Sequence, residues 1–113
     1  MTGIVQGMRI VRQDLLIDGD FEGVQFGSGV SFLLVDTDVI GYGTALHQHP
    51  YSETIVIRAG RARFVVGTEE FVGEAGQIIV VPPLTPHLFE NIGPDRLQST
   101  NIHASERYIT TWL

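Results

Sequence analysis

Short apolar runs alternate with turn residues along this chain, and no segment keeps the 3.6-residue hydrophobic period of an amphipathic helix. Residues that favour turns, chiefly glycine, proline, asparagine and aspartate, recur every eight to twelve positions or so, a spacing typical of an all-β barrel or sandwich. We therefore predict one all-β domain over residues 1–113. Residues 1–7 are expected to form a flexible tail or an arm exchanged with a neighbouring subunit.

The apolar runs predict most of the strands. The predicted strands are Met8–Gln13, Val30–Val35, Val39–His49, Glu53–Ala59, Arg61–Val66, a return strand that starts at Phe71–Val72, Gln77–Val81, His87–Asn91 and Leu97–Ala104. Residues 105–113 are predicted to be extended, and residues 14–29 to be a loop with one short strand at Val24–Phe26. The predicted strand Gln77–Val81 carries apolar side chains on both of its faces, so we expect both faces to be covered.

Composition removes several classes of function. The chain has no cysteine, which excludes disulfides and thiolate metal sites and leaves the cellular compartment open. Its net charge is −6 with no lysine, so a nucleic-acid-binding surface is not expected. No leader-like segment and no apolar run of about 18 residues is present, and we therefore expect a cytoplasmic protein without a membrane span.

Candidate chemistry is concentrated at His47, His49 and Glu53. Two histidines separated by one residue on an extended strand direct their imidazoles to the same face, because side chains alternate across a strand. After a bend at Pro50, the Glu53 carboxylate can return to that face. These three residues supply metal-ligand groups from one short stretch, and His87 is a fourth candidate.

Two spaced patterns carry a family resemblance. The stretch Gly41-x5-His47-x-His49-x3-Glu53-x6-Gly60 resembles the first motif of the cupin superfamily, and Gly76-x5-Pro82-x-Leu84-x2-His87-x3-Asn91 resembles the second. The second motif has one departure, since Leu84 stands where the family pattern usually has glycine. Together the motifs cover about half of the chain. The chain thus looks like a small single-domain cupin.

The resemblance implies a jelly-roll barrel, also called a double-stranded β-helix, in which His47, His49, Glu53 and His87 converge on one metal ion. Three neutral imidazoles and one carboxylate suit a divalent transition metal such as Fe, Mn, Ni, Zn, Cu or Co, and are a poor match for calcium or magnesium. A six-coordinate ion held by four side chains keeps two positions for water, substrate or dioxygen.

Other polar and aromatic residues are weaker candidates. Tyr51 and His103 are the modest candidates for a catalytic role beside Glu53; a lone histidine such as His103 is more often a plain structural residue, and we expect it to hold substrate without binding the metal. Candidates for hydrogen bonds to the ligands are Gln48, Tyr51, Ser52 and Asn91, which could equally be loop residues facing solvent. Candidates for a pocket lining are Phe32, Tyr42, Phe64, Phe89 and Trp112, which ordinary core packing explains as well. The strand parity of Glu90 points it away from His87.

The sequence leads to a metal-dependent cupin that acts on a small oxygenated organic molecule. Oxygenase, isomerase, cyclase and lyase chemistry all remain open, because a fold does not determine a reaction. The alternative is a non-catalytic module that binds or senses a small molecule. A homodimer is also expected, since a barrel of this size leaves strand edges to be covered and small cupins commonly pair.

Overall fold

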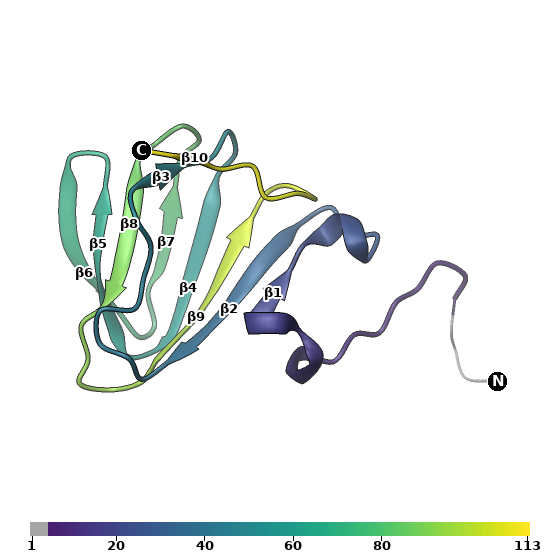
Figure 1. Ribbon diagram of the computed structural model, residues 1–113, viewed down its shortest axis with the longest axis horizontal. Coiled ribbons are helices and arrows are strands. Elements are labelled where there is room, and N and C mark those ends of the chain that lie inside the picture. Colours follow the sequence, from purple (N-terminus) through teal and green to yellow (C-terminus); the bar gives the residue numbers. More distant parts are fainter. Residues whose placement is uncertain (1–4) are drawn as a thin grey trace.

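The computed structural model describes residues 5–113 and shows two antiparallel five-stranded sheets that face each other (Figure 1). The first sheet has the spatial order β1 (Asp20–Phe21), β2 (Ser31–Thr37), β9 (Leu97–His103), β4 (Glu53–Ala59) and β7 (Ile78–Val81). The second has the order β10 (Thr111–Trp112), β3 (His47–Gln48), β8 (His87–Asn91), β5 (Arg61–Val66) and β6 (Glu69–Glu74). The predicted all-β jelly-roll fold is confirmed. Within residues 5–113, no helix is long and apolar enough to cross a lipid bilayer.

The strands with the clearest alternation were predicted at their observed bounds. β4, β5 and β8 begin and end at the predicted residues. In β5, Ala62 and Phe64 face the core while Arg63 lies outside, where its guanidinium pairs with Glu90 at 2.8 Å and with Glu70 at 3.0 Å. Glu90 thus points away from His87, as its parity predicted.

Three strand predictions were wrong. Residues 8–12 form no strand, because this segment lies apart from both sheets and finds no strand to pair with (Figure 1); it leads into three short 3₁₀ turns, η1 (Gln13–Leu15), η2 (Ile17–Gly19) and η3 (Gly23–Gln25). The short strand expected at Val24–Phe26 is therefore wrong, since most of that segment belongs to η3. The first four residues of the predicted tail lie outside the described part of the chain.

The long strand predicted at Val39–His49 is also mostly wrong. Only His47–Gln48 is strand; the preceding loop follows β8 irregularly, with one β-bridge between Gly43 and Glu90 and backbone hydrogen bonds to Phe89 and Asn91. A side chain at Gly43 would place its Cβ 1.8 Å from the carbonyl oxygen of Phe89. The loop can follow β8 this closely only because Gly43 has no side chain.

Between the sheets, the interior changes from apolar to polar along the strands. The inward side chains of β9 are Leu97, Ser99, Asn101 and His103, all at most 5% exposed. The apolar core is made of Val35, Ile55, Ile57, Ala62, Phe64, Val81, Phe89 and Leu97. His103 pairs across the sheet with Glu53, so the polar end of β9 adjoins the first strand position of β4. The fold therefore buries its histidines and its carboxylate at one end of the barrel.

The outward face of the first sheet is uncharged across two rows of paired residues. One row is Phe32, Ile102, Thr54 and Val80, and the next is Leu34, Thr100, Val56 and Ile78. At the edge strand β7, Ile78 and Val80 are 65% and 60% exposed. The expectation that β7 is covered on both faces is wrong for a single chain, because nothing in residues 5–113 packs over its outer side.

Candidate metal centre

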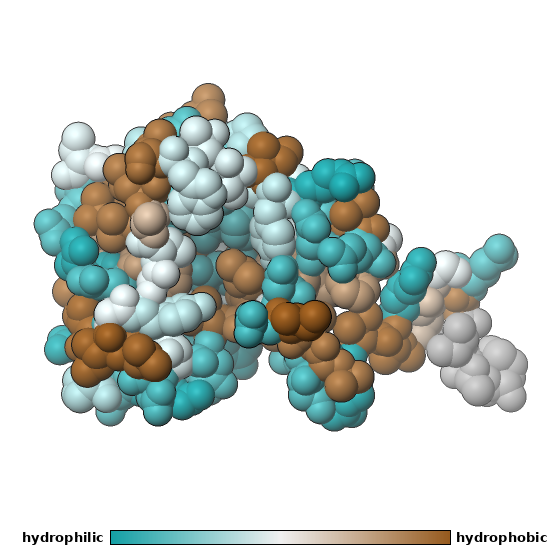
Figure 2. Space-filling view, in the orientation of Figure 1, coloured by the Kyte–Doolittle hydropathy of each residue, from teal (hydrophilic) through white to brown (hydrophobic). Residues whose placement is uncertain are grey.

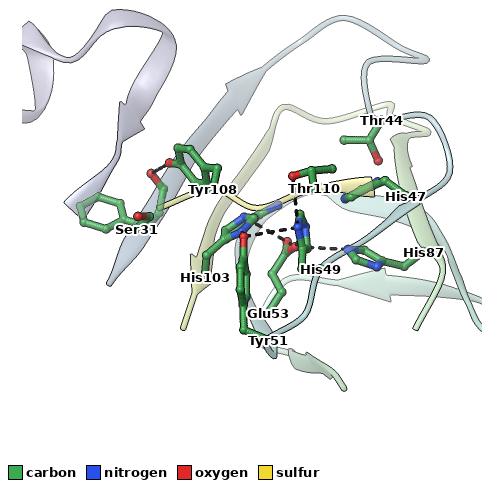
Figure 3. A network of polar contacts seen from close by, with 12 residues as sticks. Ser31, Thr44, His47, His49, Tyr51, Glu53, His87, His103, Tyr108 and Thr110 are labelled. Carbon is green, nitrogen blue, oxygen red and sulfur yellow. Dashed lines mark hydrogen bonds and ion pairs between the residues drawn. The ribbon is translucent and has the colours of Figure 1, made fainter. Parts of the chain in front are cut away.

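Four buried side chains converge between the two sheets: His47, His49, Glu53 and His87. Each offers one ligand atom, and these atoms all lie within 4.8 Å of one another. Figure 3 shows the imidazoles and the carboxylate pointing toward a common centre. The structure thus brings together the four residues expected from the sequence.

Strand pairing explains this convergence. His47 on β3 lies directly opposite His87 on β8, so both imidazoles extend from the same face of the second sheet. After His49, the segment Pro50–Ser52 carries the chain across to the first sheet, where Glu53 begins β4. The carboxylate therefore approaches the histidines from the opposite sheet.

Glu53 is the centre of the cluster. Its Oε1 lies 3.2 Å from Nε2 of His49, 3.2 Å from Nε2 of His87 and 3.6 Å from Nε2 of His103. Burial alone would raise the pKa of Glu53, but the surrounding imidazoles lower it to about 2. The carboxylate is therefore ionised at neutral pH and available as a ligand.

The tautomers of the three imidazoles follow from backbone carbonyls. Nδ1 of His47 lies 2.8 Å from the carbonyl oxygen of Ala45, Nδ1 of His87 lies 2.8 Å from that of Thr85, and Nδ1 of His49 lies 2.9 Å from that of Ile109. A carbonyl oxygen only accepts, so each Nδ1 carries a proton, and when the ring is neutral its Nε2 keeps a free lone pair.

The donor set fits a divalent transition metal. Nε2 of His49 is fully buried and makes no hydrogen bond within the described chain, because its 3.2 Å approach to Glu53 lacks hydrogen-bond geometry. A buried polar atom without a partner is uncommon in native structures and is explained by an ion that the atom would bind. Three imidazole nitrogens and one carboxylate oxygen are donors that such metals accept.

His103 and Tyr51 form a hydrogen-bonded pair beside the four ligand candidates. The Tyr51 hydroxyl lies 2.8 Å from Nδ1 of His103 and 3.3 Å from Nδ1 of His49. Burial lowers the pKa of His103 to about 4, so its ring is neutral at neutral pH. Burial also raises the pKa of Tyr51, which keeps its hydroxyl protonated. His103 faces the barrel interior together with Ser99 and Asn101, which share its side of β9 and are also buried.

The other sequence candidates have different roles. Asn91 is buried, but its side chain binds the Val39 carbonyl and the Gly93 amide, so it holds a loop and contacts no histidine. Gln48 and Ser52 make no side-chain hydrogen bond to the cluster in the described structure. Among the aromatic candidates, Phe64 and Phe89 belong to the apolar core. Phe32 stacks on Phe21 on the outer side of the first sheet, and Tyr42 is half exposed. The ring centroid of Trp112 lies 5.1 Å from that of His47.

Residues near the C-terminus contact the cluster without having been predicted to do so. The Ile109 carbonyl and the Thr110 hydroxyl both approach Nδ1 of His49, the latter at 3.2 Å. Tyr108 packs its ring edge-on against His103, with 4.9 Å between ring centroids. Only tertiary structure reveals these contacts, because about sixty residues separate Ile109 from His49. The local partners of His47 and His87 both lie two residues upstream, a spacing that the sequence does display.

Comparison with known proteins supports a common family. Residues 35–103 match the family model described as the cupin domain. An uncharacterized protein of Methanocaldococcus jannaschii is 44% identical over 55 residues, which are 48% of this chain and 44% of that protein. The chain thus matches less than half the length of this curated relative.

Solved structures of oxalate decarboxylase from Bacillus subtilis share the fold. The structure at pH 4.6 superposes with a TM-score of 0.72 and 26% identity, over 83% of this chain and 26% of that one. A second, from work on the fine structure of the Mn(II) centres of that enzyme, has a TM-score of 0.72 and 25% identity, over 88% of this chain and 29% of that one. The chain therefore spans less than a third of each of these decarboxylase chains.

Replacing a ligand histidine should empty the site. We expect His47→Ala, His49→Ala and His87→Ala each to reduce bound metal sharply after incubation with Mn²⁺ or Zn²⁺ and dialysis, as measured by elemental analysis. At a metal concentration of 100 times Kd, the intact site contributes about 2.7 kcal/mol to the free energy of unfolding, most of which should be lost. His103→Ala should leave the metal content unchanged. Equal metal content in the wild type and the three ligand variants would refute the site.

Metal affinity should fall as the pH falls, because each imidazole must be neutral to bind. Burial would lower the pKa of His87, but its hydrogen bonds with Glu53 and the Thr85 carbonyl raise it above the usual 6.5, whereas burial lowers the pKa of His47. His87 is therefore protonated before His47, and binding should begin to weaken already above pH 6.5 as the pH falls. Titration calorimetry with Zn²⁺ between pH 8 and pH 5.5 tests this; an affinity independent of pH would contradict it.

Proposed function

The chain belongs to the cupin domain family, and we propose that it is a metal-dependent enzyme acting on a small oxygenated organic molecule. The observation that carries this proposal is the buried cluster of three imidazole nitrogens and one carboxylate around a single point. His47, His49, Glu53 and His87 would hold one divalent transition metal. On a six-coordinate ion, a four-residue ligand set leaves two coordination positions open, which suits a catalytic ion better than a closed structural site.

Manganese is the first ion to test. The oxalate decarboxylase of Bacillus subtilis, whose structures share this fold, has Mn(II) centres. The mixed nitrogen and carboxylate donors found here accept manganese and the neighbouring transition metals. When bound, such an ion supplies Lewis acidity and polarises an oxygen of the substrate. The proposed substrates are accordingly small acids, hydroxyketones and enols that present an anionic oxygen.

Glu53 controls the charge available to such a substrate. Its carboxylate is ionised, because its pKa lies at about 2. Together with three neutral imidazoles it reduces the charge of a divalent ion to one formal positive charge. Binding of one anionic substrate oxygen would then make the metal site formally neutral, and an unbalanced charge inside the barrel is costly. The site therefore favours monoanionic binding groups.

His103 and Tyr51 provide a route for a proton. The neutral His103 ring lies with Nδ1 at 2.8 Å from the Tyr51 hydroxyl and with Nε2 at 3.6 Å from Oε1 of Glu53. When Tyr51 donates to Nδ1, the ring proton lies on Nε2, on the side of the cluster. In the proposed function, His103 therefore holds or exchanges one proton with a substrate oxygen bound beside Glu53, and Tyr51 orients the ring.

The interior below the cluster adds polar contacts. The Ser99 hydroxyl donates to Oδ1 of Asn101 at 2.8 Å, and both side chains are at most 5% exposed. They lie on the same face of β9 as His103, which is two residues from Asn101. A small substrate with a second oxygen would meet this polar pair, whereas a long apolar substrate would meet the core beyond it.

Glu53→Gln separates catalysis from mere binding. We expect the variant to retain part of its metal through three imidazoles and to lose turnover by at least about tenfold, a change of about 1.4 kcal/mol in the activation free energy. Its affinity for an anionic ligand should change far less. The assay is a screen of Mn²⁺- and Fe²⁺-loaded protein against small carboxylic acids, diketones and hydroxyketones, with oxygen uptake and product analysis. A protein that binds these compounds but converts none would instead be a binding or sensing module.

We also propose that the chain forms a homodimer through the outward face of the first sheet. The two uncharged rows end at Ile78 and Val80 on β7, which pairs with β4 on one side and has no neighbouring strand on the other among the described residues. Hydrophobic side chains are exposed on the N-terminal segment too, where Ile10, Leu15 and Ile17 are at least 74% exposed (Figure 2). Such apolar surfaces mark interaction sites.

Sedimentation velocity at micromolar concentration should show a species of twice the chain mass. Val80→Glu should shift it to the monomer, because a carboxylate would be buried without a partner at the interface. Val72→Glu is the matched control, since Val72 is a half-exposed valine of β6 on the other sheet. A wild-type chain that sediments only at 12.5 kDa would refute the dimer.

A further inference from the structure

The segment Tyr108–Leu113, here termed the C-terminal strap, crosses the cluster from one sheet to the other (Figures 1 and 3). At its start, the Tyr108 hydroxyl donates to the carbonyls of Phe21 and Phe32, at 3.1 and 2.8 Å. At its end, β10 pairs with β3, with Trp112 opposite His47. The strap is therefore held at both ends, and its middle lies over His49.

In the middle of the strap, every polar contact goes to the cluster. The Ile109 carbonyl lies 2.9 Å from Nδ1 of His49, and the Thr110 hydroxyl lies 3.2 Å from the same atom. The Ile109 amide donates to the Tyr51 hydroxyl at 3.3 Å. Figure 3 shows Thr110 above the His49 ring, joined to it by a dashed line.

His49 differs from the other two histidines in this respect. His47 and His87 bind the carbonyls of Ala45 and Thr85, each two residues upstream in the same loop or strand end. Those carbonyls stay in place whenever the local chain is folded. His49 has one local contact, with the Tyr51 hydroxyl at 3.3 Å, but its shorter contact, at 2.9 Å, is with a carbonyl sixty residues downstream, so docking of the strap contributes to its orientation.

Between its two anchored ends, the strap is held mainly by polar contacts. Ile109, Trp112 and Leu113 are 50%, 64% and 60% exposed, so they bury little apolar surface. Segments with few buried apolar contacts open locally at low free-energy cost. Contacts with the cluster are therefore a substantial part of what keeps the strap docked.

We propose, on the basis of the metal-binding function proposed above, that the strap is a positioning element for His49 and that its docking is coupled to metal binding. A docked strap sets the Nδ1–H tautomer of His49 and leaves Nε2 to the ion. Partners that orient a ligand histidine in this way change metal affinity by about 10–100-fold. Because coupling between two binding events is reciprocal, the bound ion stabilises the docked strap by the same factor.

Hydrogen exchange on the full-length chain tests the coupling without any substitution. With saturating Zn²⁺, the amides of Ile109 and Leu113 should exchange about 10–100-fold more slowly than in the apo protein. The Leu113 amide donates to the Leu46 carbonyl at 3.0 Å and reports on the far end of the strap. The turn at Gly67 and Thr68 serves as an internal reference and should not change beyond the global stabilisation.

A double variant tests the same coupling from the other side. Tyr108→Phe with Thr110→Val removes the hydroxyls that anchor the strap and contact His49, and should weaken Zn²⁺ binding by about tenfold or more in titration calorimetry. Nitrogen NMR of the histidine rings should show mixed tautomers for His49 and unchanged tautomers for His47 and His87. Tyr42→Phe with Thr68→Val makes the same chemical changes at exposed positions and should bind as the wild type.

The outcomes separate the two proposals. Zn²⁺ binding with unchanged strap exchange, or equal affinity and His49 tautomer in the double variant, would overturn the strap proposal and leave the metal site intact. A wild-type chain that binds neither Zn²⁺ nor Mn²⁺ would overturn both.

Discussion

An ionised carboxylate buried among three imidazoles is the constraint on which the rest of the structure depends. The Glu53 side chain is 6% exposed, and its pKa of about 2 means that it is charged at neutral pH. A charge in such a place requires a counter-charge, and a neutral imidazole that donates to a carbonyl through Nδ1 has none to offer at Nε2. A divalent ion meets the requirement. The polar interior at this end of the barrel, the paired positions of His47 and His87, and the crossing at Pro50–Ser52 all serve to bring these groups together.

The sequence predicted strands correctly where the two-residue period of a β-strand determines which side chains are buried. Burial alternates along β4, β5 and β8, because one face of each strand turns toward the interior, and these three strands were predicted at their observed bounds. Convergence of the four ligand candidates was implied by the resemblance to the two cupin motifs and is seen in the structure. The departure at Leu84 also has a structural account. This residue has a φ of 57°, a left-handed conformation that glycine adopts more readily, and its amide donates to the His49 carbonyl at 2.7 Å. The turn is kept despite the side chain, which is largely exposed.

Where the sequence-based predictions failed, tertiary contacts outweighed the local pattern of apolar and polar residues. The loop before His47 has β-prone residues, yet it follows β8 as an irregular chain because Gly43 approaches the Phe89 carbonyl too closely for a regular ladder. The segment Met8–Gln13 alternates in sequence but has no neighbour to pair with among the described residues. The roles of Ile109 and Thr110 could not be read from spacing, since backbone carbonyls carry no sequence signal and any residue supplies one.

The distant carbonyl partner of His49 also has a consequence for the order of folding. Ala45 and Thr85 can orient His47 and His87 as soon as their own short segments are formed, whereas His49 must wait for a contact that closes a loop of about sixty residues. Contacts of such long sequence separation form late, because the entropy of loop closure is lost before they contribute any stability. We therefore expect His47 and His87 to be oriented before His49, whose imidazole gains its carbonyl partner only once β10 has joined the edge of the second sheet.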